Sequence, residues 1–211
     1  MSKTEKLIDP RIERVLKQII LKDLANLGRV NWDKPHTEAV VYWMKQLLPK
    51  LLSLDLDSQV LITAAYAHDW GYAGLFAGVD STDYDQIMKR KGMHMNIGAV
   101  KIERLLYLRL SDYFSEQQIL RTVHLVEVHD SFNQIQDEDE ILLLEADTLG
   151  AMDMSRTPGT MNYESNQKYL RDVREKRLPL FKHQPAKAAA KSLLQERIDF
   201  YQKKYPNLKV G

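Results

Sequence analysis

The sequence contains no cysteine among its 211 residues. This absence excludes a disulfide scaffold, a thiolate zinc site, an iron–sulfur cluster and a cysteine nucleophile. It fits a reducing compartment, and we expect a cytoplasmic protein. Long apolar runs are also absent: the longest extends from Val60 to Ala67, well short of the ~18 residues of a membrane helix. The opening MSKTEKLIDP has neither the apolar core nor the cleavage site of a signal peptide, so we expect no membrane association.

An excess of one charge is missing as well. The chain has 30 Lys and Arg against 29 Asp and Glu, a formal net charge of +1. A protein dedicated to nucleic-acid binding normally carries a basic excess, so we do not expect that function. Apolar residues make up 44% of the chain, which is enough for a sizeable core, and the length is typical of one domain.

Glycine and proline are scarce, with nine and seven residues, and they fall mostly between segments whose apolar residues repeat every three or four positions. Asp9-Pro10, Asp57-Ser58 and the capping-box pattern from Ser115 to Gln118 are typical helix starts. No segment alternates in the manner of a strand. The sequence therefore predicts an all-α, single-domain helical bundle over residues 1–211. The expected helices span about residues 10–27, 33–49, 57–68, 84–108 with a break at Gly92, 115–130, 141–152, 163–176 and 186–203.

Nucleophile-elbow and phosphate-loop motifs are lacking, so histidine and aspartate are the remaining candidates for functional residues. His36 lies at the start of one expected helix, and His68-Asp69 ends the next, directly after a buried apolar run. Asp147 lies within an apolar helix, where an unpaired carboxylate would be costly. A metal ion would relieve that cost. Imidazole together with carboxylate suits iron, manganese, zinc or cobalt better than calcium.

The order of these residues resembles the HD superfamily of metal-dependent phosphohydrolases. That family has a His on one helix, a His-Asp pair on the next and a distal Asp. The binuclear members insert two further His before the distal Asp. The resemblance covers residues 35–156 as the motif core, with C-terminal helices over 160–205, and the family fold is a helical bundle. The matching residues are His36 in KPHTEAV, His68 and Asp69 in AAYAHDWGY, His94 in KGMHMNIGA, His129 in VHLVEVHD and Asp147 in LEADTLGAMD.

The resemblance implies an enzyme that cleaves a phosphomonoester or phosphodiester with metal-activated water. Its substrate would be a small phosphorylated molecule, with a nucleotide as one candidate. Asp69 would bridge two divalent ions (Mn, Fe, Co, Zn or Mg), while Lys91 and Arg156 would hold phosphate oxygens. The metal ligands implied are His36, His68, Asp69 and Asp147 on one ion, and Asp69, His94 and His129 on the other.

Two other functions remain open from the sequence. Some relatives with the same ligand set are di-iron oxygenases, and the site could also serve a sensor that binds a nucleotide without turnover. Five residues along a helix turn a side chain by about 140°, so we expect His124 to lie outside the site of His129. We expect His183 to be exposed in a linker. Carboxylates that could orient ligating imidazoles, or simply cap helices, are Asp33, Glu38, Glu127, Asp130 and Asp153.

Overall fold

The computed structural model describes residues 6–208, and these residues form helices and turns without any strand. The prediction of an all-α, single-domain bundle is confirmed. Within this part of the chain, no helix combines the length and the apolar content needed to cross a membrane. The α-helices are α1 (Pro10–Leu16), α2 (Lys22–Leu27), α3 (Asp33–Leu47), α4 (Ser58–Ala67), α5 (Tyr84–Lys89), α6 (Lys91–Arg109), α7 (Glu116–Val128), α8 (Glu138–Met152), α9 (Tyr163–Asp172) and α10 (Gln184–Lys204).

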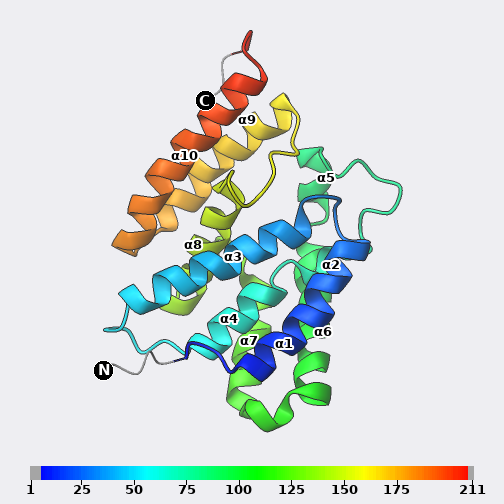
Figure 1. Ribbon diagram of the computed structural model, residues 1–211, viewed down its shortest axis with the longest axis vertical. Coiled ribbons are helices and arrows are strands. Elements are labelled where there is room, and N and C mark those ends of the chain that lie inside the picture. The colour runs from blue at the N-terminus through cyan, green and yellow to red at the C-terminus, as the bar shows by residue number, and fades with distance from the viewer. Residues whose placement is uncertain (1–5, 209–211) are drawn as a thin grey trace.

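Shorter helical turns connect several of these elements (Figure 1). A π-helical segment, Lys17–Leu21, joins α1 to α2, and a second one, Val173–Arg177, follows α9. The expected helix over residues 84–108 is two helices, and the break lies at Arg90 rather than at Gly92. The remaining 3-10 turns are Leu48–Lys50, Trp70–Tyr72, Ser111–Tyr113 and Leu178–Leu180.

Capping residues fix where the helices begin, as the sequence predicted. The Asp9 carboxylate accepts a hydrogen bond from the Arg11 amide at the start of α1, with Pro10 at the first helical position. Asp57 accepts from two backbone amides at the start of α4. Ser115 and Gln118 form the complete capping box of α7. Local sequence signals therefore set the starts of three helices before any tertiary packing is considered.

Helix α8 is the centre of the bundle: every residue from Glu140 to Met152 is buried. It packs against α3, α10, α4 and α7 (Figure 1). Gly150 makes the approach to α3 possible, because a Cβ at this position would lie 2.7 Å from Val40 Cγ2 and 2.9 Å from its amide nitrogen. Helix α4 is nearly as enclosed, with all residues from Val60 to Ala67 buried. The polar residues that these two helices carry are thus held deep in the molecule.

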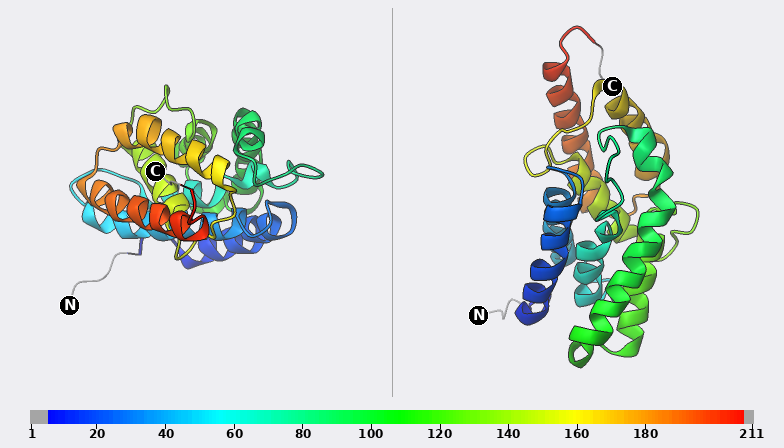
Figure 2. Two further views of the ribbon diagram at one scale, coloured as in Figure 1. Left: turned by 90° about the horizontal axis from the view of Figure 1, so that it is seen from above. Right: turned by 90° about the vertical axis from the view of Figure 1, so that its right-hand side faces the viewer.

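The turn after α4 packs tightly on α6. A Cβ on Gly71 would lie only 1.8 Å from the His94 carbonyl oxygen, so no other residue fits there without a shift of the backbone. Helices α6 and α7 pack side by side (Figure 2). These contacts bring the end of α4, the first turns of α6 and the end of α7 to one place beside α3 and α8.

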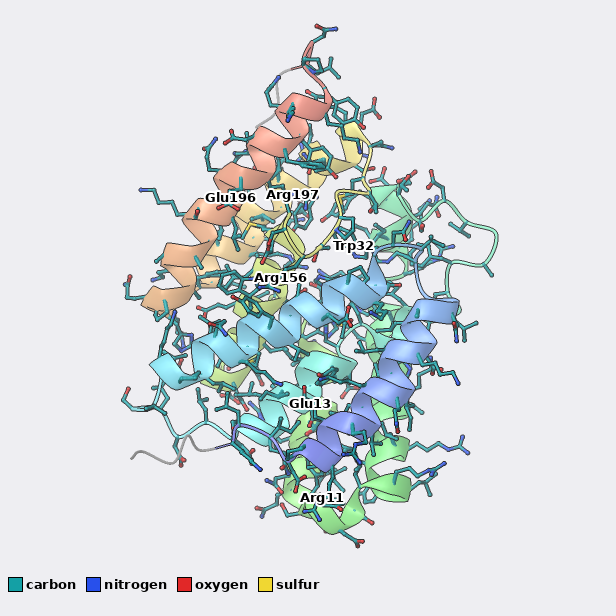
Figure 3. The ribbon with its side chains drawn as sticks, in the orientation of Figure 1. Arg11, Glu13, Trp32, Arg156, Glu196 and Arg197 are labelled. Carbon is teal, nitrogen blue, oxygen red and sulfur yellow. The ribbon has the colours of Figure 1, made fainter. Side chains whose placement is uncertain are left out.

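The Glu13 side chain links α1 to α3 and α4 (Figure 3). Its carboxylate accepts from Lys45 Nζ at 2.7 Å, from the Tyr66 hydroxyl at 2.8 Å and pairs with Lys17 at 3.0 Å. Burial raises the pKa of Glu13, but these hydrogen bonds outweigh burial and lower the pKa to about 2. Because the folded pKa is depressed, the stabilisation is present above the unfolded value of 4.5 and is lost as the pH falls toward about 2.

We therefore expect Glu13→Gln to lower the free energy of unfolding by about 1.5–3 kcal/mol at neutral pH. The difference from the wild type should shrink as the pH falls below 4.5 and should nearly vanish near pH 2. Urea unfolding at several pH values measures this. The control is Glu38→Gln, whose partner Lys34 is exposed, and we expect it to cost less than about 1 kcal/mol. If Glu13→Gln lowered the free energy of unfolding equally at neutral pH and near pH 2, the stabilisation would not come from the ionised carboxylate.

Candidate metal centre

The six residues predicted as ligands converge in the interior of the bundle. His36 comes from the first turn of α3, and Asp147 from the middle of α8. His94 lies in the first turns of α6, whereas His68 and His129 lie at the C-terminal ends of α4 and α7. None of the six, Asp69 included, is more than 6% exposed. Residues far apart in the sequence therefore form one buried cluster of imidazoles and carboxylates.

Asp69 stands between two groups of imidazoles and presents one carboxylate oxygen to each. Its Oδ2 lies 3.5 Å from His36 Nε2 and 3.6 Å from His68 Nε2. Its Oδ1 lies 3.4 Å from His94 Nε2 and 3.8 Å from His129 Nε2. This is the arrangement that a carboxylate bridging two ions requires.

Within each group the ligand atoms point at one another. His36 Nε2 lies 3.2 Å from His68 Nε2 and 3.1 Å from Asp147 Oδ1. In the other group, His94 Nε2 and His129 Nε2 are 3.2 Å apart. Two ligand atoms that are each about 2.1 Å from a tetrahedral ion lie about 3.4 Å apart, which is close to these separations. The donor atoms of each trio, with Asp69 in both, lie within 4.8 Å of one another. The residues present thus fit two ions.

The ring nitrogens that face away from the cluster show how the imidazoles are oriented. His68 Nδ1 lies 2.9 Å from the Ala65 carbonyl oxygen, and His129 Nδ1 lies 2.8 Å from that of Val126. Each carbonyl can only accept, so Nδ1 carries a proton in both rings and Nε2 is the atom that faces the cluster. Burial also lowers the pKa of His68 to about 4, so this imidazole is neutral at pH 7.

His36 and His94 are held by ring stacking instead. Trp32 stacks on His36 with centroids 5.6 Å apart, and Tyr72 stacks on His94 at 4.0 Å with the planes 10° apart. The Nδ1 atoms of both imidazoles are buried without a hydrogen-bond partner among the described residues. The stacking partners therefore fix the planes of these two rings.

The two carboxylates are ionised despite their burial. Burial raises the pKa of Asp147, but Arg177 and His36 outweigh it, so the pKa lies below its ordinary value. The pKa of Asp69 is likewise held well below the usual range, because the surrounding imidazoles, His68 foremost, outweigh burial. Both groups are thus in the protonation state that a metal ion requires.

Arg177 lies behind Asp147 and holds the oxygen that does not face the imidazoles. Its Nη1 donates to Asp147 Oδ2 at 2.7 Å, and its Nη2 donates to Asp130 Oδ1 at the same distance. Lys91 Nζ lies 3.4 Å from the same Asp130 oxygen. Arg29 plays a similar part beside Asp69: it donates to Asp33 and lies 3.6 Å from Asp69 Oδ2. These cations anchor the carboxylates from behind.

A pocket of about 70 Å³ opens beside the cluster. His36, Asp69, His129 and Asp147 form part of its wall, together with Arg29, Asp130 and Arg177. The rest of the wall is aromatic or apolar and comes largely from α5, α9 and the ends of α3 and α8. These residues are Trp32, Tyr72, Tyr84, Ile87, Met88, Ala151, Met161 and Tyr169.

Of the two residues expected to hold phosphate, only Lys91 lies near this pocket. Lys91 reaches Asp130 at the edge of the cluster, although it does not line the pocket itself. Arg156 is elsewhere: its guanidinium stacks on Tyr42 at 3.4 Å and pairs with Asp153, beside the middle of α3 (Figure 3). These partners hold its guanidinium away from the cluster, and the arginine that contacts Asp147 is Arg177.

Two other histidines can be compared with the predictions. His124 is 44% exposed in its side chain and pairs with Glu140 at 2.8 Å, outside the cluster as expected. The prediction of an exposed His183 is wrong, because its Nδ1 lies 2.7 Å from the buried carboxylate of Glu145. None of the carboxylates named as possible partners of the imidazoles contacts a ligating ring in the described residues. Asp33 and Asp130 bind arginines instead, and backbone carbonyls orient two of the rings.

Sequence reasoning missed Arg29 and Arg177. Arg29 is four residues before Asp33, a spacing that allows an ion pair across one helical turn. Arg177 had no comparable signal, because it ends the π-helical segment Val173–Arg177, which is 30 residues from Asp147. Such segments are frequent at functional sites.

Comparisons of the chain with protein-family models, curated proteins and solved structures find no match. The metal centre is therefore supported by the geometry of its own residues: the bridging position of Asp69, the paired imidazole nitrogens and the ionised carboxylates.

We expect Asp69→Ala to remove nearly all bound metal, since both groups lose their shared ligand. His129→Ala should keep about one ion per chain, because only one group is broken. The measurement is elemental analysis after loading with manganese and removal of the unbound metal. His124→Ala is the matched control and should retain the wild-type content. Full metal content in Asp69→Ala would refute the site.

The variant Arg177→Lys tests whether the Arg177 guanidinium holds Asp147 in position. The charge is kept, but an ammonium group cannot span Asp147 and Asp130 as the guanidinium does. We expect the metal affinity to fall about 10–100-fold. Arg156→Lys, the control, should bind metal as the wild type does. Titration with manganese, followed by paramagnetic broadening of water protons, measures both. Equal affinities in the two variants would show that Arg177 does not position Asp147.

Proposed function

We propose that this protein is a metal-dependent phosphohydrolase that cleaves a phosphomonoester or phosphodiester of a small molecule. The observation that carries the proposal is the position of Asp69, with one carboxylate oxygen toward His36 and His68 and the other toward His94 and His129. A carboxylate shared in this way is typical of sites that hold two ions for an in-line displacement at phosphorus.

The chain's residues divide between two ion sites. His36, His68 and Asp147 would hold one ion, His94 and His129 the other, and Asp69 would contact both. Two divalent ions bound there would supply Lewis acidity and would lower the pKa of a water molecule from 15.7 toward about 7. The protein's own part is to orient the rings of His68 and His129 through backbone carbonyls and to keep both carboxylates ionised.

The charges around the cluster favour an anionic substrate once ions are bound. Four carboxylates and three cations at the cluster leave one formal negative charge when the imidazoles are neutral. Two divalent ions would change this to three positive charges, which suits a phosphate anion. The groups counted are Asp33, Asp69, Asp130 and Asp147 against Arg29, Lys91 and Arg177.

The two arginines that line the pocket keep donors for a substrate. Arg29 uses Nε and Nη2 on its carboxylate partners, and Arg177 uses Nη1 and Nη2. Among residues 6–208, Arg29 Nη1 and Arg177 Nε have no hydrogen-bond acceptor, so both are available to phosphate oxygens. The aromatic and apolar wall opposite would receive the organic part of the ester. A nucleotide is one substrate of this kind.

The test is phosphate release under anaerobic conditions by protein loaded with manganese. We expect turnover of p-nitrophenyl phosphate, bis-p-nitrophenyl phosphate or a nucleotide, because hydrolysis needs no electron transfer. Asp69→Ala should be inactive, and His124→Ala should be as active as the wild type.

Two results would contradict the proposal. No release from any phosphoester, together with oxygen uptake by the iron-loaded protein, would identify an oxygenase. Saturable nucleotide binding without turnover, under every metal tried, would identify a sensor.

A further inference from the structure

A second hollow is lined by residues of α2, of α6 and of the turn that follows Asp69. It has a volume of about 310 Å³, which is within the lower range of small-molecule pockets. Its apolar floor is formed by the indole of Trp70 with Leu105 and Leu108. Trp70 and Leu105 are buried, whereas Leu108 is 66% exposed. None of these side chains lines the pocket beside the metal cluster.

The rim of this groove is basic. Lys101, Arg104 and Arg109 line it, and Asp23 is its one acidic residue. Asp23 already accepts a hydrogen bond from Trp70 Nε1 at 2.9 Å. No carboxylate among residues 6–208 lies within ion-pair distance of the three cations. The groove thus carries a formal charge of two positive units beside an apolar surface.

Lys101 is the most constrained of the three cations. Its Nζ reaches only the carbonyl oxygens of Trp70 at 3.3 Å and Ala73 at 3.4 Å, and it lies 5.5 Å from the Trp70 ring centroid. Neutral acceptors hold it against the turn, and Asp23, which lies beyond ion-pair distance, balances its charge only in part. An anion in the groove would supply that balance. Arg104 lies three residues further along α6, on the same face of the helix.

We propose that this groove binds a small organic anion with a flat apolar body. The body would lie on Trp70 and Leu105, and a carboxylate, sulfonate or phosphate group would contact Lys101 and Arg104. Charge complementarity and the size of the hollow favour this occupant over a protein partner, since the groove is short and bounded by long cationic side chains. The site is independent of the proposed hydrolysis, because it shares no side chain with the metal centre.

The probe is 2-naphthoate, with neutral 2-naphthamide as its matched partner of the same shape. Equilibrium dialysis gives both affinities, and the variants below report the place of binding. We expect saturable binding of the carboxylate and at least tenfold weaker binding of the amide, because one charge-assisted contact is worth about one power of ten. Arg104→Gln should weaken naphthoate binding about tenfold, and the double variant with Lys101→Gln should weaken it further.

Lys191→Gln on α10 is the control, since Lys191 is an exposed cation far from the groove in the sequence and absent from its lining. It should bind naphthoate as the wild type does. Arg104 is exposed, so its variant should fold even if the buried stem of Lys101 proves necessary. Equal binding of the acid and the amide, unchanged binding in Arg104→Gln, or no saturation at millimolar naphthoate would each overturn the proposal.

Discussion

The ionised carboxylate of Asp69, buried between two pairs of imidazoles, is the interaction on which the rest of the site depends. A carboxylate without compensation in such surroundings would become protonated or would destabilise the fold. Its pKa is nevertheless held well below the usual range by the imidazoles around it, His68 foremost. The fold provides this environment through the C-terminal ends of α4 and α7, where backbone carbonyls fix His68 and His129 with their Nε2 atoms toward Asp69. The residues that could hold a metal ion are thus the same residues that keep Asp69 ionised.

Further charged residues around Asp69 and Asp147 keep the buried charges paired. Each ligand carboxylate is backed by an arginine, and each arginine is in turn held by a further carboxylate: Arg29 by Asp33, and Arg177 by Asp130. Removing one member of such a buried network would leave its partner uncompensated, at a cost of about 3–5 kcal/mol. The network therefore limits which substitutions the core accepts.

Much of this could be predicted from the sequence. The helices begin at Asp9, Asp57 and Ser115 because these caps act within one turn of the chain. Residue type and position indicated His36, His68, Asp69 and Asp147 as candidate ligands, whereas His94 and His129 were expected only from the family resemblance. The positions of Arg156 and His183 differ from those expected. Arg156 is close to Asp147 in the sequence, yet its guanidinium contacts Tyr42 and Asp153. The arginine that contacts Asp147 is Arg177, 30 residues away in the sequence. His183 was expected in an exposed linker, but a buried Glu145 in α8 required a partner. These outcomes depend on tertiary contacts, which leave no local pattern.

The contact between Arg177 and Asp147 links the C-terminal part of the chain to the candidate metal centre. The motif residues all fall within 35–156, so the C-terminal helices could be regarded as an addition to a complete centre. Yet Arg177 anchors Asp147, and Met161 and Tyr169 line the pocket beside it. The fully buried Arg197 of α10 donates to Asn166 and to the Ala151 carbonyl, which ties these segments to the end of α8. Because an ionised Asp147 depends on a guanidinium from beyond residue 156, the ligand set and the C-terminal helices form one structural unit. A chain ending after α8 would keep every ligand and lose the group that holds the distal one in place.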